Sequence, residues 1–329
     1  MEKARFKWVL RERNRKIAAK TEVFTEQQAR RVRSFHSSFK EYSPTPLIEL
    51  TSLAQHLGIK NLFVKDESYR FELNAFKVLG GSFAIGSYIA NELGEDIDDL
   101  PYMRLVSDEV RSLLGSKTFI TTTDGNHGRG VAWTANRLKQ QAIVYMPQGS
   151  AAERLANIRA EGAQAEITDM NYDDTVRYTS ELAQKNGWII VQDTAWDGYT
   201  RIPLWIMQGY MTMALEAYEQ LPVKPTHIFL QAGVGSLAGS VQGFFADIYG
   251  SSCPLTFIVE PKGADCLYQT AAANDGSLHS VTGRLETIMA GLACGEPNSI
   301  AWEILGNLSD GFISCPDYTA AQGMRILGN

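Results

Sequence analysis

Short apolar runs alternate with longer segments whose apolar residues recur every three or four positions, most clearly from residue 62 onward. A short β-branched or apolar run is typical of a buried strand, and the longer period is typical of a helix packed on one face. Their alternation predicts an α/β fold, in which helices cover a parallel sheet on both faces. The predicted strands are Leu62–Lys65, Thr118–Thr122, Ala142–Met146, Ala165–Thr168, Trp188–Val191, Thr226–Gln231 and Leu255–Val259. The predicted helices are Thr25–Phe39, Ala152–Glu161, Tyr172–Lys185, Leu204–Glu219 and Ser236–Tyr249.

The composition is that of an ordinary globular protein. The chain has 329 residues, of which 44% are hydrophobic and 21% charged, with a mean hydropathy of -0.17. These values exclude a disordered chain, and at roughly 150 residues per domain the length suggests about two domains. The longest apolar stretch, Val78–Ala90, is interrupted by glycines and serines. It is too short and too broken to cross a membrane, so a soluble protein is predicted.

Acidic residues outnumber basic ones. Lys and Arg number 31 and Asp and Glu 37, which gives a net charge of -6. A mildly acidic surface repels phosphate backbones, so nucleic acid is not an expected partner. The first 20 residues have the opposite balance, with basic residues opposed only by Glu2 and Glu12. This segment lacks the apolar core of a secretory signal, and we interpret it as a solvated arm.

The cysteines and histidines give no sign of a metal site. Cys253, Cys266, Cys294 and Cys315 lack the close spacing of a zinc site or a redox dithiol. We interpret them as buried apolar thiols, which fits a reducing compartment and a cytoplasmic location. A pair such as Cys266 and Cys294 can still meet in space. The five histidines are scattered along the chain, so no metal is predicted.

Ligands of open α/β sheets bind at the carboxyl ends of the strands, so the segments that follow predicted strands are the leading candidates for a site. The first such segment contains Phe76 and Lys77, just before an apolar helix with glycines. A desolvated lysine there has a lowered pKa and can act as a Schiff-base amine or a proton carrier. The alternative is a surface lysine whose stem covers apolar residues, and the pattern by itself favours that alternative.

Two further segments contain glycines between a strand and a helix. In Thr121–Gly128 the glycines allow a close ligand, and helix N-terminal amides attract an anion, although ordinary turn chemistry explains Asp-Gly equally well. In Gln231–Gly239 the amides suit a phosphate, with a dinucleotide turn or close packing as the alternatives. A dinucleotide-binding oxidoreductase is disfavoured, because Glu260 is the only candidate for an acidic ribose partner.

In chain order these segments contain Asn-x-Phe-Lys, Asp-Gly-Asn-His-Gly and Gly-x-Gly-x-Leu-x-Gly. The order resembles the pyridoxal-phosphate enzymes of the tryptophan synthase β fold type. Longer blocks resemble one family within that fold type, the diaminopropionate ammonia-lyases. These blocks are VKDESYRFELNAFK, TTTDGNHGRGVAW, DMNYDDTV, VQDTAW, WIMQGY and TIMAGLACGEP. The resemblance runs from about Ser43 to the last residue, and blocks of this length are far more specific than a single glycine motif.

The resemblance implies a two-domain fold of type II with pyridoxal phosphate in the cleft between the domains. The large domain is expected at residues 1–85 and 193–329 and the small inserted α/β domain at 86–192. A homodimer is implied, with no membrane partner. Members of the family continue through a further C-terminal segment that supplies the partner of the pyridine nitrogen, so we expect no residue of this chain to fill that role. A cofactor-binding homologue without activity is therefore one alternative.

The resemblance also implies roles for single residues in holding the cofactor. Lys77 is expected to hold it as a Schiff base, with Phe76 packed beside its ring. Asn126 is expected to hydrogen-bond its phenolic oxygen. We interpret His127 as a support for the loop. The phosphate is expected at the amides of Gly233, Val234, Gly235, Ser236 and Leu237.

The implied reaction is the α,β-elimination of 2,3-diaminopropionate to pyruvate and ammonia. Lys77 is expected to take the α-proton on one face of the substrate. Asp124 departs from the wider fold type, in which Ser, Thr or Ala precedes Gly-Asn. A carboxylate on the opposite face suits the other enantiomer, so both D- and L-diaminopropionate are expected substrates.

Thr123 and Asp193 complete the expected substrate contacts. The carboxylate of Asp193 suits a cationic β-ammonium group in a partly desolvated pocket, and the alternative is an aspartate that caps a turn. The rival activity is a serine or threonine dehydratase of the same fold. A leaving hydroxyl needs no carboxylate beside it, so Asp124 and Asp193 favour the diamine.

Overall fold

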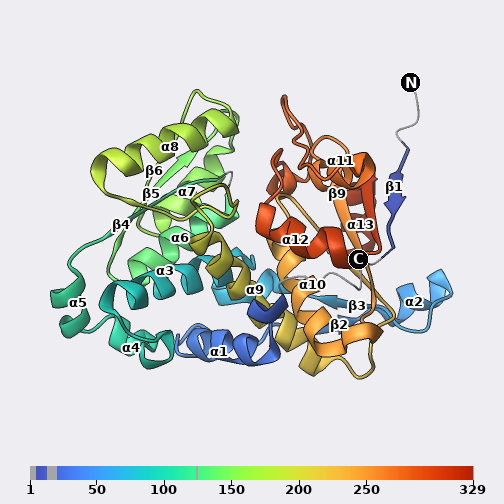
Figure 1. The fold of residues 1–329 in the computed structure, drawn as a ribbon, viewed down its shortest axis with the longest axis horizontal. Helices are drawn as coiled ribbons and strands as arrows, with labels where there is room; N and C mark the ends of the chain where they lie inside the picture. Colours follow the sequence, from blue (N-terminus) through green and yellow to red (C-terminus); the bar gives the residue numbers. More distant parts are fainter. Residues whose placement is uncertain (1–4, 13–20, 124, 329) are drawn as a thin grey trace.

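The computed structural model describes residues 5–12, 21–123 and 125–328, which form two four-stranded sheets and a two-stranded one. Figure 1 shows the two larger sheets side by side with α9 between them. The strands are β1 (Lys7–Leu10), β2 (Leu47–Glu49), β3 (Phe63–Lys65), β4 (Thr118–Thr122), β5 (Gln141–Met146), β6 (Gln164–Ile167), β7 (Ile189–Ile190), β8 (His227–Gln231), β9 (Leu255–Pro261) and β10 (Gly311–Cys315). The helices are α1 (Glu26–Ser37), α2 (Thr51–Leu57), α3 (Lys77–Leu93), α4 (Tyr102–Leu105), α5 (Asp108–Leu114), α6 (Asn126–Arg137), α7 (Ala152–Ala160), α8 (Tyr172–Asn186), α9 (Arg201–Gln220), α10 (Ser236–Tyr249), α11 (Cys266–Ala273), α12 (Ser299–Leu308) and α13 (Asp317–Leu327).

The two larger sheets are named here after a central strand. The β4 sheet has the order β6-β5-β4-β7, and every neighbouring pair is parallel. The β9 sheet has the order β1-β10-β9-β8, with only β1 antiparallel to its neighbour. The predicted strands from Thr118 to Val259 are β4 to β9. The α/β class is therefore confirmed, because parallel neighbours require helical crossovers between them.

One predicted strand lies outside both four-stranded sheets. The run predicted at Leu62–Lys65 is β3, which pairs antiparallel with β2 in a separate ribbon. Its three residues are all half-buried. A short apolar run identifies a strand but not its partner strand, which is why the sequence did not place β3 correctly.

The predicted helices correspond to α1, α7, α8, α9 and α10, with small shifts at their ends. The hydroxyl of Thr25 accepts a hydrogen bond from the backbone N–H of Gln28 at 3.2 Å, so Thr25 is the N-cap of α1. A side-chain acceptor at this position satisfies one of the N–H groups left free at a helix start. The strand β8 leads directly to α10, which starts at the predicted Ser236.

The N-terminal arm includes a strand that the sequence did not predict. β1 pairs with β10 from Lys7 opposite Ser314 to Leu10 opposite Gly311. Trp8 and Leu10 remain 65% and 68% exposed. The interpretation as a solvated arm is wrong for this backbone, because its N–H and C=O groups pair in a sheet. Residues 1–4 and 13–20 of the arm lie outside the described residues.

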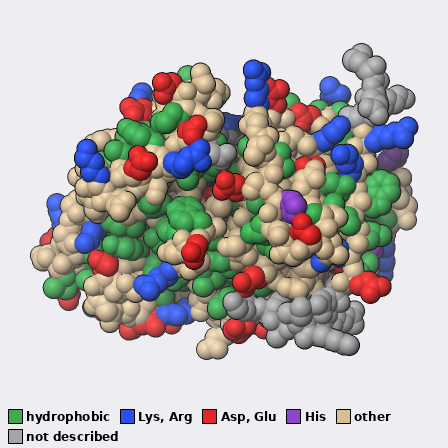
Figure 2. All heavy atoms as spheres, turned by 45° about the horizontal axis from the view of Figure 1, so that its top comes forward, with side chains coloured by type: hydrophobic (Ala, Val, Ile, Leu, Met, Phe, Trp, Pro, Cys, Tyr) green, Lys and Arg blue, Asp and Glu red, His purple; other side chains and the backbone are tan. Residues whose placement is uncertain are grey.

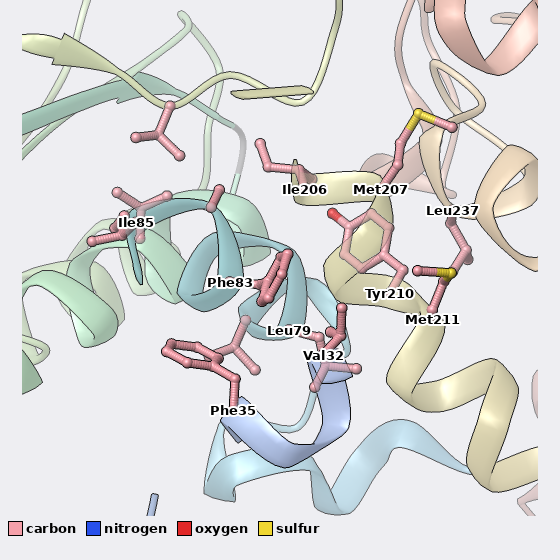
Figure 3. Close-up of a cluster of buried hydrophobic side chains, with 14 of the residues drawn as sticks. Val32, Phe35, Leu79, Phe83, Ile85, Ile206, Met207, Tyr210, Met211 and Leu237 are labelled. Carbon is pink, nitrogen blue, oxygen red and sulfur yellow. The ribbon is translucent and has the colours of Figure 1, made fainter. Parts of the chain in front are cut away.

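Helices α3 and α9 pack closely at the centre of the molecule. A Cβ at Gly80 of α3 would lie 2.7 Å from Ile206 and Tyr210 of α9. A Cβ at Gly209 of α9 would collide with the carbonyl oxygen of Leu79. Figure 3 shows side chains of α1, α3 and α9 meeting in one hydrophobic cluster. The two glycines therefore allow α9 to lie directly against the first turn of α3.

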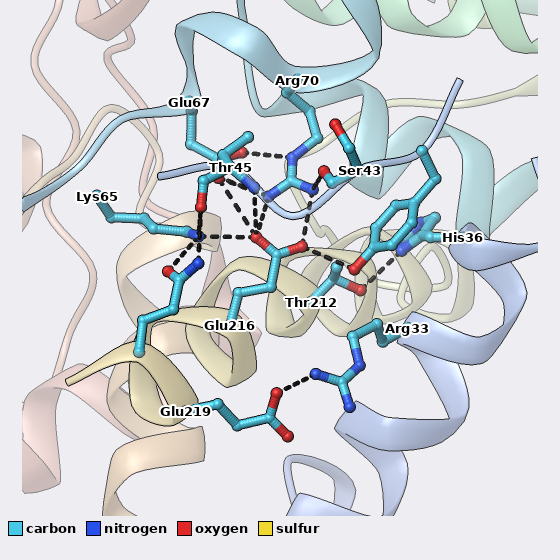
Figure 4. Close-up of polar contacts among 12 residues, drawn as sticks. Arg33, His36, Ser43, Thr45, Lys65, Glu67, Arg70, Thr212, Glu216 and Glu219 are labelled. Atoms are coloured by element: carbon cyan, nitrogen blue, oxygen red, sulfur yellow. Dashed lines mark hydrogen bonds and ion pairs between the residues drawn. The ribbon is translucent and has the colours of Figure 1, made fainter. Parts of the chain in front are cut away.

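A cluster of buried charges joins the segment before α3 to α9 (Figure 4). We call Lys65, Glu67, Arg70 and Glu216 the Glu216 network. The guanidinium of Arg70 donates to Glu216 at 2.8 and 2.7 Å and to Glu67 at 2.8 Å. Lys65 Nζ lies 2.8 Å from Glu216, and Tyr42 donates to Glu216 at 2.9 Å. The side chains of Arg70 and Glu216 are 0% and 1% exposed, and the opposite charges compensate each other.

The backbone between the Glu216 network and α3 is strained. Phe71, Glu72 and Asn74 have φ angles of 49°, 61° and 58°, in the left-handed region that non-glycine residues rarely adopt. Such residues persist when their surroundings hold them in place. Here the Glu216 network holds the start of the segment, and α9 holds the first turn of α3 after it.

The surface agrees with the nearly balanced composition. In Figure 2, basic and acidic side chains are interspersed over the face shown, without a large area of one sign. Among the described residues, no helix is both long enough and apolar enough to span a membrane.

Candidate active site

The site is centred on Lys77 and Asp193. Lys77 is the first residue of α3, and Asp193 lies in the loop that follows β7. The ammonium of Lys77 donates a hydrogen bond to Oδ2 of Asp193 at 2.5 Å. Their side chains are 20% and 7% exposed. The fold therefore places a lysine and a carboxylate, far apart in sequence, in one largely buried ion pair.

Burial and charge act on this pair in opposite directions. Burial lowers the pKa of Lys77, but the attraction of the Asp193 carboxylate outweighs it and raises the pKa above the ordinary value of 10.5. Burial raises the pKa of Asp193, and the positive charge of Lys77 brings it down to about 2. Both groups are therefore charged at neutral pH. Lys77 must lose a proton before its amine can act as a nucleophile.

A glycine loop, residues 233–237, joins β8 to α10 and forms a second part of the site. Gly235 has a φ of 101°, which glycine adopts readily. A Cβ at Gly233 would lie 3.2 Å from Sγ of Cys294, so the facing loop would have to move. The first N–H groups of a helix have no acceptor within it and attract anions. The loop and the start of α10 therefore suit a phosphate.

Asn298 ties the Asp193 segment to the glycine loop. Its Nδ2 donates to the carbonyl oxygen of Asp193 at 3.1 Å and to Oγ of Ser236 at 2.8 Å. Ser236 donates to the same carbonyl oxygen at 2.6 Å. The backbone N–H of Asn298 donates to the carbonyl of Val234 at 2.8 Å. Asn298 is fully buried, and no motif of the sequence selects it.

Gln192 ties the same segment to the β4 sheet. Its Oε1 accepts from Oγ1 of Thr121 at 3.0 Å and from the N–H of Thr122 at 3.1 Å. Its Nε2 donates to the carbonyl of Thr122 at 3.1 Å and to the hydroxyl of Tyr172 at 2.8 Å. Asp193 is thus held from both sheets, by Gln192 on one side and by Asn298 on the other. Gln192 was also missed by the sequence reasoning.

Two neighbouring cavities lie at the site. One, of about 30 Å³, is lined by Phe76, Lys77, Asp193, Tyr210, the loop 231–237, Gly291, Leu292 and Cys294. The other, of about 240 Å³, shares Val234 and Cys294 with it. Its further lining residues are Tyr172, Val176, Arg177, Ser180, Gln192, Thr194, Trp196, Gly295 and Glu296. The expected residues Phe76, Lys77, Asp193 and 233–237 therefore meet around one cavity, and their roles stay predictions.

Near the ion pair, Oη of Tyr210 and Nδ1 of His127 are buried and have no hydrogen-bond partner among the described residues. Tyr210 is 1% exposed and His127 3% exposed. Nε2 of His127 lies 2.7 Å from the carbonyl of Val191, which agrees with its predicted role as a support for the loop. Unpartnered buried polar atoms are rare in native proteins. Tyr210, which lines the Lys77 cavity, was noted in the sequence only as part of the block WIMQGY.

These groups fit pyridoxal phosphate by their chemistry. The amine of Lys77 suits its aldehyde, and the N–H groups at the start of α10 suit its phosphate. Oη of Tyr210, buried and without a hydrogen-bond partner among the described residues, is a further polar group at the cavity. The described residues therefore match the cofactor that the resemblance implies.

The segment Thr121–Gly128 is less closely associated with the cavity. Oγ1 of Thr123, a buried residue, accepts from the N–H of Gly125 at 3.0 Å. Asn126 starts α6, is exposed, and is not among the residues that line the Lys77 cavity. Its expected contact with the cofactor stays a prediction. Asp124 lies outside the described residues.

The cysteines near the site, Cys266 and Cys294, form no disulfide with any described residue. Cys266 is buried and Cys294 is half-buried, so the interpretation as buried thiols is right for the first and too strong for the second. Sγ of Cys266 lies 3.8 Å from the carbonyl of Gly233, and burial raises the pKa of the Cys266 thiol. Both cysteines therefore pack against the glycine loop.

The chain is similar to known proteins over most of its length. Residues 39–329 match the family described as pyridoxal-phosphate dependent enzyme. The diaminopropionate ammonia-lyase of Salmonella typhimurium is 53% identical over 299 residues, which are 90% of this chain and 74% of that protein.

Two solved structures of the Escherichia coli diaminopropionate ammonia-lyase are also similar. One, in complex with D-serine, is 50% identical with a TM-score of 0.90, over 99% of this chain and 81% of that one. The other, in complex with an aminoacrylate-PLP azomethine reaction intermediate, is 49% identical with a TM-score of 0.88, over 99% and 80%.

Proposed function

The chain belongs to the family of pyridoxal-phosphate dependent enzymes and within it to the diaminopropionate ammonia-lyases, and from this premise we propose its reaction. The reaction is the α,β-elimination of 2,3-diaminopropionate, as the D or the L isomer, to pyruvate and ammonia. One water is consumed and two ammonia molecules leave for each pyruvate, so all atoms balance. The observation that carries the proposal is the pairing of Lys77 with Asp193 beside the glycine loop, in a chain 53% identical to a named lyase.

We propose that pyridoxal phosphate is attached covalently at Nζ of Lys77. Phe76 would lie beside its ring, and Asn126 would hydrogen-bond its phenolic oxygen. The N–H groups of residues 233–237 would hold its phosphate, which the positive end of α10 favours. When bound, the cofactor supplies an electron sink that weakens the bonds at the α-carbon of the substrate.

The chain's own acids and bases are proposed to divide the work by position. Lys77 would accept the α-proton on one face of the substrate and the carboxylate of Asp124 on the other. Asp193, whose pKa of about 2 keeps it negative at neutral pH, would attract the β-ammonium group. Thr123 would contact the substrate beside Asp124.

Pyruvate release tests the proposal. The protein supplied with pyridoxal phosphate would be given D-diaminopropionate, L-diaminopropionate or L-serine, with Lys77→Ala as the control. Release from both diamines, well above serine, supports the lyase. Release mainly from serine would indicate a dehydratase instead. No release, with the cofactor fixed to Lys77 by borohydride, would mean binding without turnover.

The role of Asp124 has its own test. Asp124→Asn should abolish turnover of D-diaminopropionate, since the amide cannot take a proton, while much of the L-isomer activity remains because Lys77 is unchanged. The measurement is pyruvate release from each isomer by the variant and the wild type. Equal losses for the two isomers would refute the division between Asp124 and Lys77.

We also propose the domain division and the assembly that the family resemblance implies. The large domain would comprise residues 1–85 and 193–329 and the small domain 86–192. The positions of β4 to β7 between residues 118 and 190, with β1 and β8 to β10 outside that stretch, support this division. A homodimer in the cytoplasm, without nucleic-acid or membrane partners, is proposed from the same resemblance. The lack of a disulfide among the described cysteines supports a reducing compartment, and the net charge of -6 supports the exclusion of nucleic acid.

A further inference from the structure

We propose that Tyr210 is a positioning residue for Lys77: its phenol donates a hydrogen bond to the Lys77 amine when that amine is neutral. The inference rests on the role of Lys77 proposed above. Tyr210 lines the same small cavity as Phe76, Lys77 and Asp193. Its hydroxyl is buried and has no hydrogen-bond partner in the described structure.

The ring of Tyr210 is fixed by its packing. It meets the ring of Phe76 edge to face at a centroid distance of 5.2 Å. On its other side it fills the space above Gly80, where a Cβ would lie 2.7 Å from the ring. Figure 3 shows the side chain of Tyr210 in the hydrophobic cluster between α3 and α9. These contacts hold the ring between Phe76 and Gly80, and the hydroxyl lies at the Lys77 cavity.

The two protonation states of Lys77 offer different partners to this hydroxyl. A charged ammonium has three donors and no acceptor, and here it donates to Asp193. A neutral amine has a lone pair, so it can accept the phenol proton. The donor of Tyr210 is thus unsatisfied while Lys77 is charged and satisfied when Lys77 is neutral, which favours the reactive amine.

The surrounding groups keep Tyr210 in the donor form. Burial raises the pKa of Tyr210 above its ordinary value, although the positive charge of Lys77 acts in the opposite direction. Among the described residues, the other titratable groups that act on Lys77 or Asp193 are His127 on α6 and Cys294 on the facing loop. Burial lowers the pKa of His127, which favours its uncharged form. Asp193 favours the charged form of Lys77 and Tyr210 the neutral form, so the two residues act in opposite directions on the protonation of Lys77.

The test is the pH dependence of cofactor attachment in Tyr210→Phe. Protein freed of cofactor would be mixed with pyridoxal phosphate, and the rate of attachment to Lys77 followed by visible absorbance. The phenylalanine keeps the ring and removes only an unpaired hydroxyl, so the variant should fold as well as the wild type. Tyr218→Phe is the matched control, because Tyr218 lies on the same helix and contacts Phe244 and Tyr249 instead.

The loss of one hydrogen bond to the neutral amine should raise the pH midpoint for attachment by about one unit. At neutral pH, attachment should be about tenfold slower in Tyr210→Phe than in the wild type, and the two should converge at high pH where the amine is neutral in both. Tyr218→Phe should match the wild type throughout.

Equal midpoints in Tyr210→Phe and the wild type would overturn the inference, and so would a rate loss of the same size at every pH, which a structural defect would give. In both results wild-type attachment at Lys77 is normal, so the proposed function stands. A wild-type chain that fails to attach the cofactor at Lys77 would overturn the proposed function and this inference together.

Discussion

Two buried clusters of charge lie against helix α9, and they are built differently. In the Glu216 network, Arg70 and Glu216 are nearly inaccessible to solvent and every charged group has an opposite charge beside it. At the other cluster, Lys77 pairs with Asp193, while the nearby Tyr210 hydroxyl and His127 Nδ1 have no hydrogen-bond partner in the part of the chain that the structure describes.

The difference lies in which cation each cluster uses and in what is left unsatisfied. Arg70 cannot lose its proton in a protein, so its cluster has one charge state and one arrangement. Lys77 can change its charge, and its neighbours include polar atoms that have no hydrogen-bond partner among the described residues. A fully satisfied buried cluster thus holds the backbone in one arrangement, whereas an incompletely satisfied one allows its lysine to change charge.

Breaking the Glu216 network should have the largest effect on stability. Glu216→Ala leaves Arg70 charged, buried and without its main partner, and such a loss costs about 3–5 kcal/mol. Urea unfolding of the variant and the wild type measures it. Glu219→Gln is the control, because Glu219 lies on the same helix with its side chain 36% exposed. A loss for Glu216→Ala as small as that of the control would contradict the comparison.

Acid should remove most of the stability that the Glu216 carboxylate contributes. Burial raises the pKa of Glu216, but hydrogen bonds from Arg70 and the charges of Arg70 and Lys65 lower it from 4.5 to about 2. A lowered pKa stabilises the fold above the unfolded value and loses that stabilisation as the pH falls through the folded value. The stability difference between the wild type and Glu216→Gln should therefore shrink by about 3 kcal/mol from about pH 5 to pH 2. Urea unfolding at several pH values measures it, and a constant difference would refute the assignment.

Breaking the second pair should have the smallest effect on stability. Asp193→Asn removes the carboxylate, but Lys77 is 20% exposed and can respond by losing its proton. We expect a loss of about 1 kcal/mol in urea unfolding, well below that of Glu216→Ala. A loss as large as that of Glu216→Ala would show that the two clusters serve the same structural purpose.

Much of the fold was predictable because its signals are local. The strands from β4 to β9 are apolar runs bounded by polar turns, and α10 begins directly after Gly235. The pairing of β1 with β10 was not predictable, because Lys7 and Ser314 meet through a contact that spans nearly the whole chain. Four largely exposed residues carry no strong alternation that would identify β1 as a strand.

The site was predictable in the residues that carry a motif. Lys77 and Gly233 belong to short patterns with a chemical meaning. Gln192 and Asn298 do not, because an amide that bridges two loops is recognised only when both loops are in place. Tyr210 reads as one more apolar position of a helix, and its unpartnered hydroxyl becomes visible only in three dimensions.

The pairing of β1 with β10 in the β9 sheet has a consequence for the order of folding during synthesis. The strands of the β4 sheet lie between residues 118 and 190, so they leave the ribosome in direct succession. β1 emerges first, yet its partner β10 begins only at Gly311. A chain that folds as it is made would therefore complete the β4 sheet early, whereas β1 would have no partner strand until nearly all of the described residues had been translated.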